Sequence, residues 1–285
     1  MTQMLGVIAG SGIDNIDELI FIKNHTIDTP WGKPSGSILE CKFTGLKIFF
    51  LQRHGDNHKL PPSCINYRAN IDALKQLGVS DILSLSSVGS LRNELTPGNF
   101  VIIDQYIDLT KKRESTFFQD DIVVHVSMAK PTDDTLMQIA KMSLDSLSIN
   151  YTFGATYVCI EGPQFSTLSE SKLYKNWGCD VIGMTNMPEA KLCREASIRY
   201  ASIGMITDYD CWHPNYENVE VLNVIETLKS NTKKAQKLII NFLSKYSKTK
   251  IENNLDAHLS LVTPKNKINK DTIDKLKNIM PQLLK

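Results

Sequence analysis

The sequence has 285 residues, of which 42% are hydrophobic and 22% are charged, a composition typical of a globular protein. This length is enough for one large α/β domain with a well-buried core, or for two small domains. The formal net charge is +1 at pH 7, which argues against an extended basic surface for nucleic acid or an anionic membrane. We therefore expect any bound anion to be held by a local site.

The sequence indicates neither a metal centre nor a membrane segment. Its six cysteines form no Cys-x-x-Cys pair, and we expect them to be reduced thiols. His54 and His58 have a spacing found in metal sites, but no third ligand lies nearby in the sequence. The apolar run at 5–9 is too short for a signal peptide, and no apolar stretch approaches the ~20 residues that cross a bilayer. We expect a cytoplasmic protein with no metal and with no nucleic-acid or membrane partner.

Short apolar runs alternate with longer helical patterns, which predicts an α/β fold with a largely buried sheet. The expected strands are 5–9, 47–52, 81–86, 99–103, 156–161, 180–184 and 201–207. The expected helices are 63–77, 132–147, 168–177, 188–198 and 219–246. Thr132 or Asp133 is placed to cap the second of these helices. Several strands end in small or polar residues, as they do where open α/β sheets build their sites.

The composition changes near residue 248, where Lys and Asn become frequent and Pro264 interrupts the pattern. We therefore expect one domain over residues 1–247. Residues 248–285 would form a C-terminal arm that packs on the same domain or on a neighbouring subunit. Within this arm, 271–284 regains a helical pattern of apolar residues.

Two motifs after predicted strands are suited to binding an anion. The first is a glycine-rich turn at 6–12, in which glycines allow close approach of backbone amides and Ser11 adds a hydroxyl. It matches neither a P-loop nor the dinucleotide fingerprint, and a tight structural turn is the alternative. The second contains Arg53 and His54, since arginine offers a planar fork of donors for phosphate oxygens. A surface salt bridge is the alternative for Arg53.

Two further motifs place small or aromatic residues after strands. Ser86 and Ser87 lie in a run of small hydroxyl residues that permits close approach of a flat ligand or a sugar, although a plain turn is the alternative. Phe165 follows Glu161-Gly-Pro-Gln and offers a ring face to a base or a ribose. An ordinary core position is the alternative for Phe165.

Asp208 and Asp210 follow the predicted strand 201–207. Carboxylates at positions i and i+2 face one cleft if the chain stays extended there. A departing purine needs a proton or a strong hydrogen bond at N7, and a carboxyl group kept protonated in an apolar pocket supplies it. An ionised carboxylate could accept a hydrogen bond from an exocyclic amine. A helix cap and a solvent-facing aspartate are the alternative.

The order and spacing of these motifs resemble the trimeric purine nucleoside phosphorylase family, and most closely its methylthioadenosine-cleaving branch. The resemblance runs from about residue 4 to about 246, and its motifs are highly specific in combination. It is carried by Arg53-His-Gly, Asn66-Tyr-Arg-Ala-Asn, Glu161-Gly-Pro-Gln-Phe, Met184-Thr with Pro188-Glu, and Thr207-Asp-Tyr-Asp.

The resemblance implies a three-layer α/β/α sandwich with a central mixed sheet, assembled as a homotrimer without metal or cofactor. Inorganic phosphate would be a co-substrate, and Asp208 and Asp210 would be the catalytic residues. The implied phosphate site consists of Ser11, Arg53, His54, Ser86 and Thr185. The implied nucleoside site consists of Ser87, Phe165, Met184, Thr207, Val221, Val224, Ile225 and, from a neighbouring subunit, His125.

The implied reaction is phosphorolysis of S-methyl-5′-thioadenosine to adenine and 5-methylthioribose 1-phosphate, in purine and methionine salvage. Asp208 favours 6-aminopurines, because relatives that prefer 6-oxopurines usually have Asn there. Ser87 and Val88 depart from the residues usual in the most similar relatives, and both bear on base preference. The alternatives are a methylthioinosine or general purine nucleoside phosphorylase, a nucleosidase that uses water, and a non-catalytic nucleoside-binding module.

Overall fold

The computed structural model describes residues 3–10, 12–13, 16–214, 221–252 and 255–284, and within 221–226 it describes the backbone only. None of the helices in these ranges is long and apolar enough to span a membrane. Along the chain, strands alternate with helices, as the sequence predicts.

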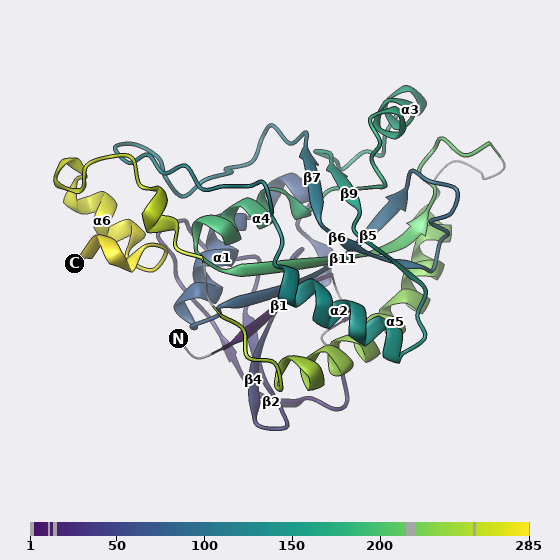
Figure 1. Ribbon diagram of the computed structural model, residues 1–285, viewed down its shortest axis with the longest axis horizontal. Helices are drawn as coiled ribbons and strands as arrows, with labels where there is room; N and C mark the ends of the chain where they lie inside the picture. Colours follow the sequence, from purple (N-terminus) through teal and green to yellow (C-terminus); the bar gives the residue numbers. More distant parts are fainter. Residues whose placement is uncertain (1–2, 11, 14–15, 215–220, 253–254, 285) are drawn as a thin grey trace.

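A single mixed sheet forms the centre of the molecule (Figure 1). Its strand order begins β2-β3-β4-β1-β5, and β5 then pairs with both β10 and β11. The pairs β1–β4, β1–β5 and β5–β11 are parallel, whereas β5–β10 is antiparallel. The strands are β1 (Leu5–Ala9), β2 (Ile20–His25), β3 (Ile38–Phe43), β4 (Leu46–Gln52), β5 (Asp81–Ser90), β6 (Phe100–Ile103), β7 (Gln105–Asp108), β8 (Tyr151–Phe153), β9 (Thr156–Cys159), β10 (Val181–Gly183) and β11 (Arg199–Asp208).

Helices cover both faces of the sheet, which confirms the predicted three-layer α/β/α sandwich. Successive side chains of β1 alternate between two apolar cores, so Ile8 packs on one face while Val7 packs on the other. Helices α1 and α4 cover the first face, and α2 and α5 cover the second (Figure 1). The helices are α1 (Tyr67–Gln76), α2 (Asp134–Ser146), α3 (Leu168–Asn176), α4 (Asn186–Glu195), α5 (Val221–Tyr246) and α6 (Lys270–Leu276).

The predicted helices differ from the observed ones mainly at their ends. Helix α1 begins at Tyr67, where the side chain of Asn66 accepts a hydrogen bond from the amide of Ala69. Of the two candidate caps for α2, Asp133 is the one that accepts a hydrogen bond from a first-turn amide. Helices α1 and α2 therefore start directly after the residue whose side chain satisfies an otherwise unpaired amide.

Four strands have no counterpart in the prediction: β2, β3, β7 and β8. Strand β2 lies at the sheet edge with most of its side chains exposed, so it has no alternation of buried and exposed residues. Strands β7 and β8 have only four and three residues. These three strands are therefore too exposed or too short to carry a recognisable periodicity. Strand β3 has six residues, three of them buried, but its buried residues do not alternate strictly with exposed ones.

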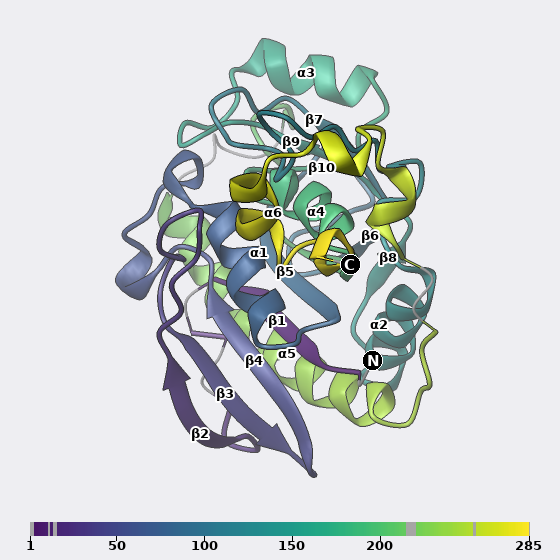
Figure 2. The ribbon, with the colours of Figure 1, turned by 90° about the vertical axis from the view of Figure 1, so that its left-hand side faces the viewer.

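The C-terminal arm packs against the same chain on the α1 and α4 side (Figure 2). Its expected helix over 271–284 is divided into α6 and a 3-10 turn at Pro281–Leu284. Leu276, Ile279 and Leu283 are buried in the apolar core that contains α1. The side chain of Lys275 lies over the ring of Trp31, 4.6 Å from its centroid.

Candidate active site

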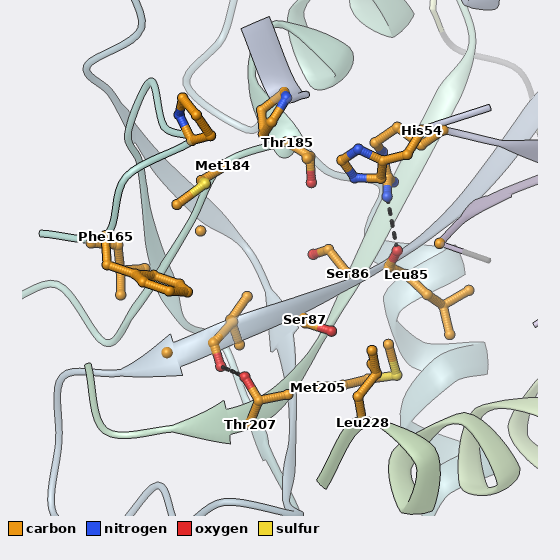
Figure 3. Close-up of a pocket in the computed structure, with 18 of the residues that line it drawn as sticks. His54, Leu85, Ser86, Ser87, Phe165, Met184, Thr185, Met205, Thr207 and Leu228 are labelled. Atoms are coloured by element: carbon orange, nitrogen blue, oxygen red, sulfur yellow. Dashed lines mark hydrogen bonds between the residues drawn. The ribbon is translucent and has the colours of Figure 1, made fainter. Parts of the chain in front are cut away.

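One pocket of about 650 Å³ lies at the carboxyl ends of β1, β4, β10 and β11 and along β5 (Figure 3). Open α/β sheets usually bind ligands at this edge, because strand ends leave backbone and side chains free to converge. Of the residues predicted for the site, the pocket brings together Arg53, His54, Ser86, Ser87, Phe165, Met184, Thr185, Thr207, Asp208 and Asp210.

The remaining predicted residues are not in the described pocket. Ser11 lies outside the described residues, and so do the side chains of Val221, Val224 and Ile225. His125 is exposed in a segment joined to the C-terminal arm, where its amide donates to the carbonyl of Ser260. Its predicted role across a subunit interface stays a prediction.

Arg53 is a buried group at the wall of the pocket, so the alternative of a surface salt bridge is wrong. Its Nε and Nη2 donate to the two carboxylate oxygens of Glu189, at 2.8 and 3.1 Å. Burial by itself lowers the pKa of Arg53, but the charge of Glu189 raises it above its usual value. One Nη1 hydrogen bonds the carbonyl of Leu85, and the second has no acceptor among the described residues. That second hydrogen is the one with which Arg53 can bind an anion.

The backbone fixes the hydrogen-bonding state of His54. Its Nδ1 lies 2.8 Å from the carbonyl oxygen of Leu60, which can only accept, so Nδ1 carries a hydrogen. Burial lowers the pKa of His54 to about 4, which keeps the ring neutral at pH 7. A neutral ring with its hydrogen on Nδ1 leaves Nε2 as an acceptor. In this state Nε2 of His54 is able to accept a hydrogen bond from a ligand.

A network of buried polar groups lies behind the hydroxyls of the pocket. Ser86 Oγ donates to the side-chain oxygen of Asn186 at 3.3 Å, and the Asn186 amide donates to Tyr200 and Ser202. Tyr200 in turn donates to Glu189 at 2.8 Å. These contacts connect Ser86 to the Arg53–Glu189 pair and fix the side of the pocket on which His54, Ser86 and Thr185 lie (Figure 3).

Asp208 and Asp210 line the pocket where β11 ends. Burial is the main cause that raises the pKa of each, which favours the protonated carboxyl. The sequence-based argument required an extended chain at these residues. The chain is not extended there, because Asp210 has a φ of 51°. This turn allows the Asp210 amide to donate to Asp208 Oδ1 at 2.8 Å. Asp210 Oδ2 is buried, and the nearby hydroxyl groups of Ser171 and Ser166 oppose the rise in its pKa that burial causes.

Close packing requires glycine at two positions of the pocket wall. A Cβ atom at Gly89 would lie 2.9 Å from Asp208 Oδ1, so the absent side chain lets the carboxylate approach β5. A Cβ atom at Gly183 would lie 2.1 Å from the hydroxyl oxygen of Tyr157. The same hydroxyl accepts the amide hydrogen of Thr185 at 3.2 Å, so Tyr157 supports the strand end that carries Met184 and Thr185.

The apolar wall combines predicted and unpredicted residues. Phe165 is 47% exposed, so its alternative assignment as an ordinary core residue is wrong. Helix α5 contributes Leu228 and Thr232, one turn apart, and Met205 on β11 lies next to Leu228 (Figure 3). Sequence analysis missed these three residues. Leu228 and Thr232 are four residues apart, so the sequence indicates that they share one face of a helix. It does not indicate whether that face meets the pocket.

The sequence matches the profile described as Phosphorylase superfamily over residues 4–244. The chain belongs to this superfamily. An S-methyl-5′-thioadenosine phosphorylase of Rhodospirillum rubrum is 53% identical over 236 residues, covering 83% of this chain and 80% of the relative. One of Synechocystis is 43% identical over 281 residues, covering 95% and 85%.

Solved structures of this superfamily agree with the fold described above. A methylthioadenosine phosphorylase from an Antarctic soil metagenomic library superposes with a TM-score of 0.93 at 43% identity, covering 98% of this chain and 99% of that one. The methylthioadenosine phosphorylase of Schistosoma mansoni in complex with adenine gives 0.84 at 34% identity, covering 87% and 93%. This similarity confirms the nucleoside phosphorylase fold predicted from the sequence.

Proposed function

We propose that the chain cleaves S-methyl-5′-thioadenosine with inorganic phosphate, releasing adenine and 5-methylthioribose 1-phosphate. The observation that carries the proposal is that one pocket joins Arg53 and His54 to the partly buried carboxyl group of Asp208. Phosphorolysis of an N-glycosidic bond needs an anion held near the sugar and a proton donor near the departing base. The enzymes of Rhodospirillum rubrum and Synechocystis named above support this choice of substrate.

Phosphate is assigned to Ser11, Arg53, His54, Ser86 and Thr185. The unpaired Nη1 hydrogen of Arg53 donates to a phosphate oxygen, as does the Thr185 hydroxyl. Hydrogen phosphate carries one hydrogen of its own, and Nε2 of neutral His54 accepts it. The site is thereby matched to hydrogen phosphate through both donors and an acceptor.

The nucleoside is assigned to the other walls. Phe165 and Met184 lie against the base and the ribose, with Ser87 and Thr207 beside them, and Asp210 accepts from the exocyclic amine. The 5′-methylthio group is assigned to Val221, Val224 and Ile225 on α5. Leu228 is assigned to the same group, because it lines the pocket.

The reaction breaks the bond between C1′ and N9 of adenine while a phosphate oxygen bonds to C1′. In the transition state the sugar carries positive charge, and the bound phosphate dianion stabilises that charge. Protonated Asp208 donates its proton to N7 as electron density moves onto the base. Hydrogen phosphate releases one proton to solvent as the sugar phosphate dianion forms, and Asp208 regains one proton from solvent, so adenine leaves neutral and the enzyme is unchanged. No cofactor takes part in this scheme.

We also infer a cytoplasmic homotrimer in which His125 of the partner subunit completes the nucleoside site. Phe165 and Leu168 are about half exposed beside the pocket, which is where a neighbouring subunit would cover apolar surface. The test mixes two inactive variants, Asp208→Asn and His125→Ala, after unfolding and refolding together. Mixed trimers contain some sites with both native residues, so activity should return. Absence of recovery in trimers confirmed by light scattering would contradict the sharing of His125.

The primary experiment follows free adenine from S-methyl-5′-thioadenosine with and without phosphate. We expect release that depends on phosphate and is much faster than hypoxanthine release from inosine or from methylthioinosine. Faster turnover of a 6-oxopurine nucleoside would make the protein a methylthioinosine or general purine nucleoside phosphorylase. Release in water alone would make it a nucleosidase. If no nucleoside is cleaved yet calorimetry detects nucleoside binding, the protein is a binding module.

A further inference from the structure

Glu161 and Arg113 form an ion pair outside the pocket that touches three of the segments lining it. Arg113 follows β7 in a loop, and its side chain is only 1% exposed. Its Nε lies 3.0 Å from a carboxylate oxygen of Glu161. Neither residue is part of the described pocket lining, and the reaction proposed above assigns no task to either.

Arg113 binds the backbone of two pocket segments at once. Its Nη1 donates to the carbonyl oxygens of Met184 and Met187, at 2.6 and 2.5 Å. Its Nη2 donates to the carbonyl oxygen of Glu161 at 2.8 Å. The first segment carries Met184 and Thr185 into the pocket, and the second leads to Phe165.

Glu161 binds the third segment and the loop of Arg113 itself. Its carboxylate accepts from the hydroxyl of Ser63 at 2.6 Å and from the amides of Lys111 and Lys112, at 2.6 and 3.0 Å. Ser63 follows Pro61 and Pro62, which line the pocket. Burial alone raises the pKa of Glu161, but these hydrogen bonds lower it to about 2, so it is ionised at every working pH.

We propose that the Glu161–Arg113 pair is a positioning device that sets the spacing between the ribose, phosphate and base walls of the pocket. The proposal rests on the function proposed above, because those walls matter only if a nucleoside and phosphate react between them. A guanidinium suits this task, since its planar donors reach several acceptors in fixed directions. A lysine ammonium carries the same charge, but it lacks the planar fork of donors that reaches the three carbonyl groups and the carboxylate together.

The test compares Arg113→Lys with Arg199→Lys. Arg199 is an equally buried arginine that pairs with Asp81 where β11 begins, away from the pocket end of that strand. Both variants should lose thermal stability to a similar degree. Only Arg113→Lys should raise KM for phosphate and for the nucleoside, and its kcat/KM should fall roughly 10²-fold, the usual effect of misplacing reacting groups by about 1 Å.

Glu161→Gln is the second variant, which keeps the shape of the side chain but removes its charge. We expect a smaller loss of kcat/KM in the same direction, and a double variant less impaired than the product of the two single losses, because both residues act through one contact network. Equal kinetic constants for Arg113→Lys, Glu161→Gln and Arg199→Lys would overturn the proposal.

Calorimetric binding of adenine and of inorganic phosphate separates this proposal from the proposed function. If the wild-type protein binds both but cleaves no nucleoside, the proposed function fails while the positioning role is still measurable. Weaker binding of both molecules by Arg113→Lys, with Arg199→Lys unchanged, then supports the pair as a positioning device. Unchanged binding by Arg113→Lys overturns it.

Discussion

Asp208, the proposed proton donor, is also a carboxyl group whose ionised form lowers the stability of the fold. Its side chain is partly buried at the end of β11, where it accepts hydrogen bonds from the Thr207 hydroxyl and the Asp210 amide. Those bonds favour the ionised form, but burial opposes them and raises the pKa above its ordinary value. A carboxyl group with a raised pKa stabilises the folded state only while it is protonated, so its contribution is lost as pH rises through the folded-state pKa.

Substitution Asp208→Asn should therefore separate activity from stability. We expect the rate of S-methyl-5′-thioadenosine cleavage to fall roughly 10²–10³-fold, because the proton donor is removed. The melting temperature should equal or exceed that of the wild type at pH 8, and this advantage should shrink at pH 5. Kinetics and thermal denaturation at both pH values measure the two effects. Asp134→Asn, at an exposed position, should change neither. The assigned pKa shift would be contradicted if the melting temperature of Asp208→Asn, measured relative to that of the wild type, were lower at pH 8 than at pH 5.

The partners of the site residues were harder to predict than the residues themselves. Arg53 and Asp208 follow buried strands in recognisable motifs, so sequence analysis placed both at the pocket. Glu189 lies 136 residues from Arg53, and its role as the counter-ion follows only from how α4 packs on the sheet. Arg113 has no motif at all, because it acts through backbone carbonyl groups whose positions depend on the tertiary fold.

Helix α3 is held more weakly than the other helices around the pocket. Only Ser171 and Tyr174 of its nine residues are buried, and it projects from the body of the molecule (Figure 1). A capping box formed by Thr167 and Glu170 satisfies its first amides. The helix directly follows Phe165 and Ser166, so its first turn determines where one wall of the pocket begins.

Removing this cap should be felt in substrate binding. Thr167→Ala costs about 1 kcal/mol of local helix stability. Because α3 has little other support, we expect faster amide hydrogen exchange in α3 and a KM for the nucleoside raised several-fold. Asp133→Ala removes a comparable cap from α2, away from the pocket, and should leave KM unchanged. A KM equally raised in both variants would show that global destabilisation is the cause.

Strands were predictable where burial gave them a pattern. The predicted segments 5–9 and 81–86 coincide with buried stretches of β1 and β5, since apolar side chains must fill both cores. Three of the four strands that escaped prediction, β2, β7 and β8, lie at edges and pair with a single neighbour, whereas β3 lies between β2 and β4. Edge position, unlike burial, leaves little trace in composition.

At the scale of the whole molecule, the C-terminal arm belongs to the core of its own chain. Asp121 accepts the hydroxyl hydrogen of Thr272, and the Val262 amide donates to the carbonyl of Val123 at 2.9 Å. Leu276 is 1% exposed within the core that contains α1. The sequence left open whether the arm packs on its own domain or on a neighbour, and these contacts lie within one chain.

Leu276→Ala should consequently destabilise the protein by about 2–5 kcal/mol through the cavity it creates. Leu259→Ala, at a side chain that is 83% exposed, should change stability by less than about 0.5 kcal/mol. Urea denaturation measures both. We also expect the dependence of the unfolding midpoint on protein concentration to be the same for Leu276→Ala and for the wild type. If the arm crossed to a partner, Leu276→Ala would change that dependence.

Position 183 shows how packing restricts the routes by which this pocket can diverge. Any side chain there would overlap Tyr157, and replacing Tyr157 with Phe would not suffice, because the ring carbon Cζ already lies 2.6 Å from the Cβ position. A descendant must first accept a much smaller residue at 157, losing the hydroxyl that accepts from Thr185, before 183 can vary. Variation at 183 is thus coupled to residue 157 and, through its hydroxyl, to the strand end that carries Thr185.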